Sequence, residues 1–248
     1  MDTQLGRTAM LWYLRFDVTV ALMSGFVPKM ERQWFDYMLD YYRDQAREFP
    51  HSLRLKMALA SAEMRHMSME LSLIIAQANR GTISEADYVK QHAVLTVRID
   101  KWRTEMDPAL RDARYLVTNL EAHAQMTDEE RREEIVDPFE LGLLYGGPLF
   151  VMTALTVEWL SVAVMSRSQL PASLAATTQD RFVQYMDLAR YARTTAQIYE
   201  AVELWSDQPK GALIPIHSAL GFSMLFLPHD QKHHWWFRKK LALQEQRG

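Results

Sequence analysis

Three side chains of one helical segment have the types and spacing of a metal site. Glu63, His66 and Glu70 stand at positions i, i+3 and i+7, which places them on one face of a helix. Di-iron bundles use such Glu-x-x-His pairs, but they need a second pair and two further carboxylates on facing helices. We identify no such set here. We therefore interpret the three residues as a polar helix face and expect no metal and no other cofactor.

A second pair of possible zinc ligands lies near the C-terminus. His229 and His233 are four residues apart, so they could share one helix face, as in zinc-binding helices. A zinc site needs a third protein ligand from elsewhere in the chain, and nothing in the sequence indicates one. The adjacent Trp235 and Trp236 favour amphipathic packing of a terminal helix instead.

The same terminal segment carries a basic patch, formed by Lys232, Arg238, Lys239 and Lys240. These residues are candidates for phosphate contact or nuclear targeting. The alternative, which we favour, is that they complement the helix dipole near a C-terminus and keep the surface soluble. The acidic run at residues 128–134 lacks the interleaved apolar residues of an activation segment, so we interpret it as a solvated face.

Hallmark nucleophile motifs are missing from the sequence. It has no cysteine, no Gly-x-Ser-x-Gly, no phosphate loop and no Rossmann glycine triplet. His217 beside Ser218 is interpreted as a hydrogen-bonded core residue. Catalysts that work by pocket shape need few hallmark residues, so an enzyme stays an alternative. Its candidate carboxylates are Glu158 and Glu203, each within an apolar helical segment. We lean towards a protein without catalytic activity.

Aromatic and methionine side chains could line an effector pocket between helices. The same residues could equally form the core. The candidates for pocket or core, including the two carboxylates above, are Trp12, Phe16, Met64, Met67, Trp159, Glu158, Glu203 and Trp205.

Helical periodicity dominates the chain, and strand signals are weak. Apolar spacing and breaker residues predict helices over residues 8–23, 34–47, 52–79, 84–102, 148–165, 181–205, 210–227 and 230–245. Residues 107–137 are largely polar and predict an acidic surface excursion, with a short helix at 127–134; a loop is expected at 166–179. We predict an all-α fold with one helical domain over residues 1–248, made of about eight to ten helices.

Composition limits the function classes. The chain has 248 residues, enough for a substantial core, and a net charge of −3, whereas free nucleic-acid binders usually carry a basic surplus. The absence of cysteine excludes disulfides and cysteine-ligated zinc. Two long uncharged runs, at residues 141–157 and 211–229, could be mistaken for membrane spans, but proline and glycine interrupt both. We therefore expect a soluble protein with no membrane contact.

Several stretches, taken in order, resemble the fungal-specific transcription factor domain, the helical regulatory region of fungal Zn2Cys6 zinc-cluster regulators. The match extends from about Thr8 to Gly248, and its order along the chain is more specific than any one piece. The stretches are Met10–Gly25, Trp34–Phe35, Trp102–Arg103 with Met106–Pro108, Val136–Glu140, Tyr145–Phe150, Trp205–Ala212, Leu225–Asp230 and the aromatic and basic closing segment.

The resemblance implies a nuclear regulatory domain that acts through a small-molecule effector, dimerisation or co-regulator contact; the cytoplasm is the alternative location. The regulators of this family carry a six-cysteine zinc cluster and a linker before the domain. This sequence begins almost directly in the helical part, so we expect no direct DNA binding by this chain. A cyclase, isomerase or cycloaddition enzyme that reuses the fold, and a protein-interaction scaffold, are the alternatives.

Overall fold

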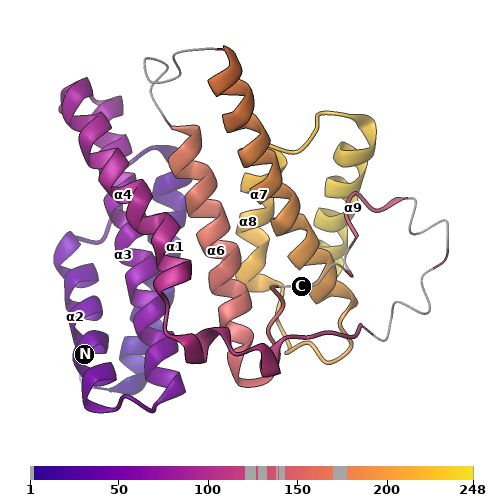
Figure 1. Ribbon diagram of the computed structural model, residues 1–248, viewed down its shortest axis with the longest axis horizontal. Helices are drawn as coiled ribbons and strands as arrows, with labels where there is room; N and C mark the ends of the chain where they lie inside the picture. The colour runs from indigo at the N-terminus through magenta and orange to yellow at the C-terminus, as the bar shows by residue number, and fades with distance from the viewer. Residues whose placement is uncertain are drawn as a thin grey trace. The chain divides into compact units, whose positions relative to one another are not determined.

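The computed structural model describes residues 3–120, 127, 133–137, 139, 143–169 and 178–247 (Figure 1). In these residues the regular secondary structure is helical, apart from one isolated bridge between Leu116 and Tyr145, which confirms the all-α prediction. The chain divides into two compact units. Unit 1 comprises Met1–Asp112 and Met165–Ala175, and unit 2 comprises Ala113–Val164 and Ala176–Gly248. That these units make up one domain stays a prediction.

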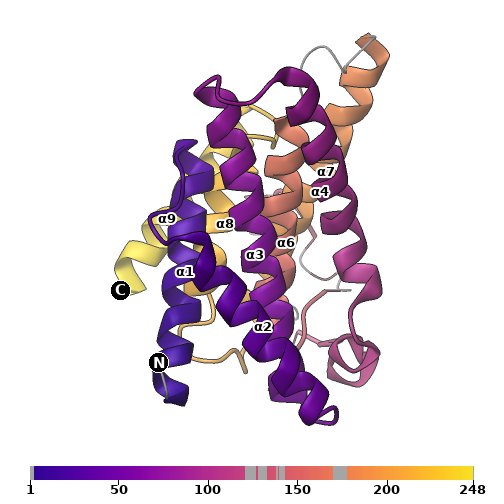
Figure 2. The same ribbon diagram turned by 90° about the vertical axis from the view of Figure 1, so that its left-hand side faces the viewer.

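Unit 1 is built around one long, largely buried helix. This helix, α3, contacts the other three α-helices of the unit and a short 3-10 turn, η1, as Figure 2 shows for the α-helices. The elements are α1 (Gln4–Ser24), α2 (Arg32–Glu48), α3 (Leu53–Asn79), α4 (Glu85–Glu105) and η1 (Pro108–Arg111).

The core of unit 1 forms where α1 and α2 pack on α3. Leu14 and Val18 of α1 meet Phe35 and Met38 of α2, with Met69 of α3 in the same cluster. Burying each such side chain contributes about 1.5–3 kcal/mol before conformational entropy is subtracted. Leu14 and Val18 are one turn apart, so they fix which side of α1 faces inwards.

Helix ends in unit 1 follow from short-range chemistry. The Ser52 hydroxyl accepts from the amide of Leu55 and starts α3, and the Ser84 hydroxyl accepts from the amide of Asp87 and starts α4. Gly25 ends α1 in the left-handed region at φ 70°, where a Cβ would also lie 2.9 Å from the side chain of Asn79. These starts and this stop were predicted from the sequence.

Unit 2 contains most of α6 and the last three helices. Its elements are η2 (Ala113–Tyr115), η4 (Gly147–Leu149), α6 (Phe150–Ser168), α7 (Thr178–Leu204), α8 (Ile214–Met224) and α9 (Gln231–Arg247). Residues of α6 from Met165 onwards are grouped with unit 1. Helices α7 and α8 pack side by side (Figure 1).

The entry to α6 is tied to the segment around η2. The amide of Gly146 donates to the carbonyl of Tyr115 at 2.7 Å, and the amide of Tyr145 donates to the Thr153 hydroxyl at 2.7 Å. A Cβ on Gly146 would lie 3.3 Å from the ring of Trp205, so glycine lets Trp205 pack closely. Two of the stretches that carry the fungal-domain resemblance therefore meet inside unit 2.

Some predicted boundaries differ from the structure. Helix α1 begins at Gln4 rather than at residue 8, because Thr3 caps it by accepting from the amide of Gly6. Helix α6 continues to Ser168, into the predicted loop at 166–179. Most of the predicted short helix at 127–134 lies outside the described residues.

Among the described residues, Gly147–Ser168 is the helical stretch that is long and apolar enough to cross a membrane. In its most apolar window, 72% of the residues are buried inside the protein. This burial is what a core helix requires.

Candidate functional site

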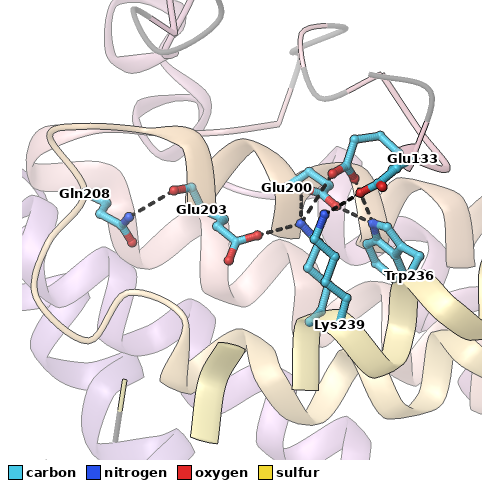
Figure 3. Close-up of polar contacts among 8 residues, drawn as sticks. Glu133, Glu200, Glu203, Gln208, Trp236 and Lys239 are labelled. Atoms are coloured by element: carbon cyan, nitrogen blue, oxygen red, sulfur yellow. Dashed lines mark hydrogen bonds and ion pairs between the residues drawn. The ribbon is translucent and has the colours of Figure 1, made fainter. Parts of the chain in front are cut away.

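A buried cluster of charged side chains joins α7 to α9 in unit 2 (Figure 3). The ammonium of Lys240 donates to Glu200 at 2.7 Å and to Glu203 at 2.6 Å. A carboxylate oxygen of Glu134 lies 3.7 Å from the same nitrogen. Only 3% of Lys240 and 1% of Glu200 are exposed. We call these residues, together with Trp236, the Lys240 cluster.

Trp236 supplies the other donor of the Lys240 cluster. Its indole N–H donates to Glu134 at 2.8 Å and also to Glu200, while its ring lies edge-on to Tyr199. Trp236 and Lys240 are four residues apart on α9, so they share one helix face. One face of α9 thus presents both donors to the carboxylates of α7.

The carboxyl groups of Glu200 and Glu134 shift each other's pKa in opposite directions. Burial, together with the hydrogen bond to Glu134, raises the pKa of Glu200 to about 8. Burial alone would raise the pKa of Glu134, but the hydrogen bond with Glu200 and the charge of Lys240 lower it. Of the two carboxyl groups, Glu200 therefore keeps its proton to higher pH than Glu134 does.

Lys240 stays positively charged in this setting. Burial alone would lower its pKa, but the negative charges of Glu200, Glu203 and Glu134 outweigh burial and raise the pKa above its ordinary value. A lysine with a raised pKa is a poor nucleophile, since nucleophilic lysines need a lowered one. Lys240 is therefore suited to holding α9 against α7 rather than to covalent chemistry.

The end of α7 is fixed beside the cluster. The side-chain amide of Gln208 donates to the backbone carbonyl of Glu203 at 3.4 Å, as Figure 3 shows. This contact satisfies a carbonyl that the helix end leaves without an intrahelical partner. The backbone that carries Glu203 is thereby held where its carboxylate can reach Lys240.

In unit 1 a second polar network connects α2, α3 and α4. The Nε2 atom of His66 lies 2.8 Å from Asp36, and its Nδ1 atom lies 3.6 Å from Glu70. Glu70 also accepts from Arg98 at 2.6 Å and lies 3.6 Å from Arg32. The predicted polar face of α3 thus pairs with charges on both neighbouring helices.

The two carboxylates around His66 change its titration. Burial alone would lower the pKa of His66, but the hydrogen bonds with Glu70 and Asp36, together with their charges, raise it above its ordinary value. Nearby, burial raises the pKa of Glu63. Both His66 and Glu63 therefore keep their protons to higher pH than the same side chains do in water.

Two open clefts lie beside this network, and Arg98 borders both. The first, of about 420 Å³, has an apolar floor and a charged rim; it is lined by Arg32, Glu70, Leu73, Ile74, Gln77, Asp87, Lys90, Gln91, Val94, Leu95 and Arg98. The second, of about 350 Å³, includes Glu63, His66, Met67 and Trp102 in its lining. Both clefts belong to unit 1, and neither is lined by a residue of the Lys240 cluster.

The side chains considered as metal ligands do not converge. In the part of the chain that the structure describes, no group of three or more His, Asp or Glu side chains is placed to hold a metal ion. His233 is engaged by Asp230, whose carboxylate lies 2.8 Å from the ring and accepts from the His233 amide at 2.9 Å. His233 thus belongs to the start of α9.

Residues predicted for a pocket or the core fall into three groups. Met64, Met67, Trp159 and Glu158 are buried, and Met67 lines the second cleft. Trp205 is half-buried against Phe150, and Glu203 belongs to the Lys240 cluster. The prediction was wrong for Trp12 and Phe16, because 44% of the surface of Trp12 and 56% of that of Phe16 is exposed. They lie on the side of α1 opposite Leu14 and Val18, so the core never receives them.

The predicted basic surface also needs a correction. Lys232 and Arg238 are exposed, and Lys239 pairs with Glu133 at 2.8 Å. Lys240 is buried and cannot contribute to a surface patch. Its position four residues after Trp236 puts it on the packed side of α9, and that spacing was the signal available in the sequence.

Several residues of these networks were missed by sequence reasoning. Glu200 was not a candidate, although it stands three residues before Glu203 on one helix face. Asp36 and Arg98 meet the predicted Glu63–Glu70 face from helices far away in the sequence. No local pattern indicates such long-range pairs.

A contact surface on α1 is the other candidate site. The side of α1 that faces away from the core carries large apolar side chains, and the half-buried Arg15 lies at its edge. We call this surface the α1 face; it comprises Leu5, Trp12, Tyr13, Phe16, Val20 and Met23, all of them exposed.

Two charged residues of α1 outside this face have partners within unit 1. The guanidinium of Arg7 stacks over the ring of Tyr41 at 4.5 Å. The carboxylate of Asp17 accepts from the amides of Lys29 and Met30 at 2.9 and 2.8 Å. Large aromatic and aliphatic side chains are therefore exposed to water along the outer side of α1.

Comparisons of this chain with protein-family models, curated proteins and solved structures gave no match. The resemblance to the fungal-specific transcription factor domain stays a prediction from the sequence.

Proposed function

We propose that this chain is a regulatory module that acts in transcription control, in the nucleus, through protein or ligand contacts and without binding DNA itself. Its motifs support this proposal by their order, which resembles the regulatory region of fungal zinc-cluster regulators. The observation that carries it is the α1 face. A regulator without catalytic or DNA-binding chemistry must act through a contact surface.

The composition of the α1 face supports protein contact. Contiguous exposed apolar patches of more than a few hundred Å² are rare on monomers and mark interaction sites. Interface centres are depleted in charge and enriched in aromatic residues and methionine. Trp12, Tyr13, Phe16 and Met23 give the α1 face this composition, and no Lys, Glu or Asp interrupts it.

A small-molecule effector is a second route of action, supported by the first cleft. Its volume of about 420 Å³ falls within the range of ligand sites. Its apolar floor includes Ile74 and Leu95. Its rim carries residues of both charges, namely Arg32, Glu70, Asp87, Lys90 and Arg98. This combination suits an amphipathic molecule with a polar group.

The enzyme alternative would need a perturbed carboxyl group with a free oxygen. Glu200 has a raised pKa, but one of its oxygens accepts from Trp236 and the other from Lys240. Protein donors thus occupy both oxygens, so a structural role of Glu200 explains its environment better than general acid–base catalysis does.

A tethering assay tests the proposed function. The full chain is fused to a heterologous DNA-binding domain and directed to a reporter promoter. We expect reporter transcription to change at least severalfold relative to the DNA-binding domain alone. A fusion that is present in the nucleus at equal level and leaves transcription unchanged would contradict the proposal.

A further inference from the structure

We infer that residues 133–135 form a latch on α7 and α9 that is closed while Glu200 is protonated and opens when Glu200 ionises. The latch lies within unit 2 and is independent of the α1 face. Three observations support it: the contacts of the latch, the charges that meet there, and the pairing that remains without it.

The latch is held in place by its side chains. The carboxylate of Glu133 accepts from the ammonium of Lys239 at 2.8 Å, as Figure 3 shows. The carboxylate of Glu134 accepts from the indole N–H of Trp236 at 2.8 Å, and only 8% of the Glu134 side chain is exposed. The next residue, Ile135, is buried as well. Two acidic contacts and one buried apolar side chain therefore fix this segment.

Three carboxyl groups of the Lys240 cluster meet one ammonium group at the latch. Lys240 donates to Glu200 at 2.7 Å and to Glu203 at 2.6 Å, whereas a carboxylate oxygen of Glu134 lies 3.7 Å away. Like charges repel strongly where little water surrounds them. Once Glu200 ionises, three negative charges share one positive charge. Glu134 is then the carboxylate that Lys240 holds least closely.

The charges that act most strongly on Glu200 come from the latch and from α9. Burial and then the hydrogen bond to Glu134 raise the pKa of Glu200, and the charge of Lys240 only partly opposes them, so that this pKa is about 8. Within unit 2, α6 contributes Glu158 and α8, which packs on α7, contributes His217 as further titratable side chains.

The sign of the pH dependence follows from this arrangement. When the latch opens, Glu134 no longer raises the pKa of Glu200, so the open form binds the proton less tightly than the closed form does. Closing is therefore fully favoured below the pKa of the open form and becomes unfavourable as pH rises through about 8. Over that interval, each pH unit lowers the equilibrium constant for closing by up to about tenfold.

The buried donors of the cluster keep partners when the latch opens. Trp236 also donates to Glu200, and Lys240 retains both Glu200 and Glu203. The carboxylate of Glu134 meanwhile regains the hydration that burial removes. Helices α7 and α9 can therefore stay joined while the latch opens, so the change is local rather than global.

Nuclear magnetic resonance of the isoleucine methyl groups of the full chain tests the latch between pH 6 and pH 9. The signal of Ile135 is assigned with Ile135→Val. At pH 6 we expect it at a position set by packed neighbours, and by pH 9 at least half of the way to the position of isoleucine in an unstructured peptide. The signal of Ile198, buried in α7, should not move, which would show that unit 2 stays folded.

Two variants at the latch separate its opening from other effects of pH. Glu200→Gln should keep the latch closed through pH 9, because an amide does not ionise. Glu133→Gln is the matched control and should retain a transition of wild-type size, since its contact with Lys239 is partly exposed. If Glu200→Gln disturbs the Ile198 signal, Glu134→Gln takes its place and should also stay closed, because it removes the other charge.

Each outcome decides the inference. An Ile135 signal that keeps its pH 6 position to pH 9 in the wild type would overturn it, and so would a full transition in Glu200→Gln or in Glu134→Gln. An indole signal of Trp236 that shifts while Ile135 stays in place would show that Glu200 titrates with the latch closed, which also overturns it. The tethering assay reads a different surface, so the proposed function stands or fails separately.

Discussion

The Nζ atom of Lys240 lies 2.7 Å from a carboxylate oxygen of Glu200, and both residues are almost fully withdrawn from water. This contact, together with the ion pair between Lys240 and Glu203 at 2.6 Å, connects α9 to α7 within unit 2. Removing one partner from a buried pair leaves the other charge uncompensated, which costs more than the pair itself contributes. The position of α9 should therefore be sensitive to substitutions in the Lys240 cluster and insensitive to substitutions beside it.

Lys240→Met should lower the free energy of unfolding by about 3–5 kcal/mol, because Glu203 and the Glu200–Glu134 pair lose their cation. Lys239→Met is the matched control. Its ion pair with Glu133 is partly exposed, and it should cost no more than about 1 kcal/mol. Urea unfolding of both variants measures the difference. Equal effects would show that the Lys240 cluster does not stabilise α9.

Glu200 should make the protein less stable as pH rises. Its pKa of about 8 in the folded chain lies above its ordinary value of 4.5, so the folded state holds a proton that the unfolded state releases. Its contribution is fully present below about pH 4.5 and is lost as pH rises through 8, with a slope of up to about 1.4 kcal/mol per pH unit.

Glu200→Gln tests this pH dependence, because an amide keeps the size and stays neutral. Urea unfolding between pH 5 and 8 should give a flatter stability profile for this variant than for the wild type. Glu133→Gln, at a more exposed position beside the cluster, should retain the wild-type slope. A wild-type slope in Glu200→Gln would place the titration on another group.

Trp236→Phe should remove the indole N–H that two carboxylates share. Hydrogen bonds to charged groups contribute about 1.5–3 kcal/mol each, so we expect a loss of about 2–4 kcal/mol from the free energy of unfolding. Trp235→Phe alters the neighbouring, exposed ring and should cost less than about 0.5 kcal/mol. Thermal or urea denaturation of both variants measures the two losses of stability. Similar losses would contradict the role given to the indole N–H of Trp236.

His66 should titrate above its ordinary pKa and stabilise unit 1 when protonated. Its contribution is present below about pH 6.5 and is lost as pH rises through the raised folded pKa. Asp36→Asn should lower the pKa of His66 as measured by NMR titration of the ring. Asp40→Asn, on the same helix and paired with Arg43 at 2.7 Å, should not change it.

Local chemistry explains why much of the fold was predictable. The caps at Ser52 and Ser84 and the stop at Gly25 depend on residues within one turn of each, so the sequence contains their whole signal. Periodicity likewise identified the long helices. Trp12 and Phe16 were misplaced because they were chosen for their aromatic type, although they lie on the side of α1 opposite Leu14 and Val18.

The candidate site was less predictable because its contacts are long-range. The polar face at Glu63, His66 and Glu70 was correctly identified on one helix, but the partners Asp36 and Arg98 lie about thirty residues away on either side. Lys240 looked like a surface lysine among basic neighbours. Only the packing of α9 against α7 makes it a buried ion.

The most direct test of the central claim is the reporter response of the tethered chain with Phe16→Glu. The account predicts that a charge in the α1 face abolishes the response, while Val97→Glu on α4 leaves it at the wild-type level. Both fusions must be folded and equally abundant. An undiminished response from Phe16→Glu, or an equal loss from Val97→Glu, would contradict the claim that this chain acts through the α1 face.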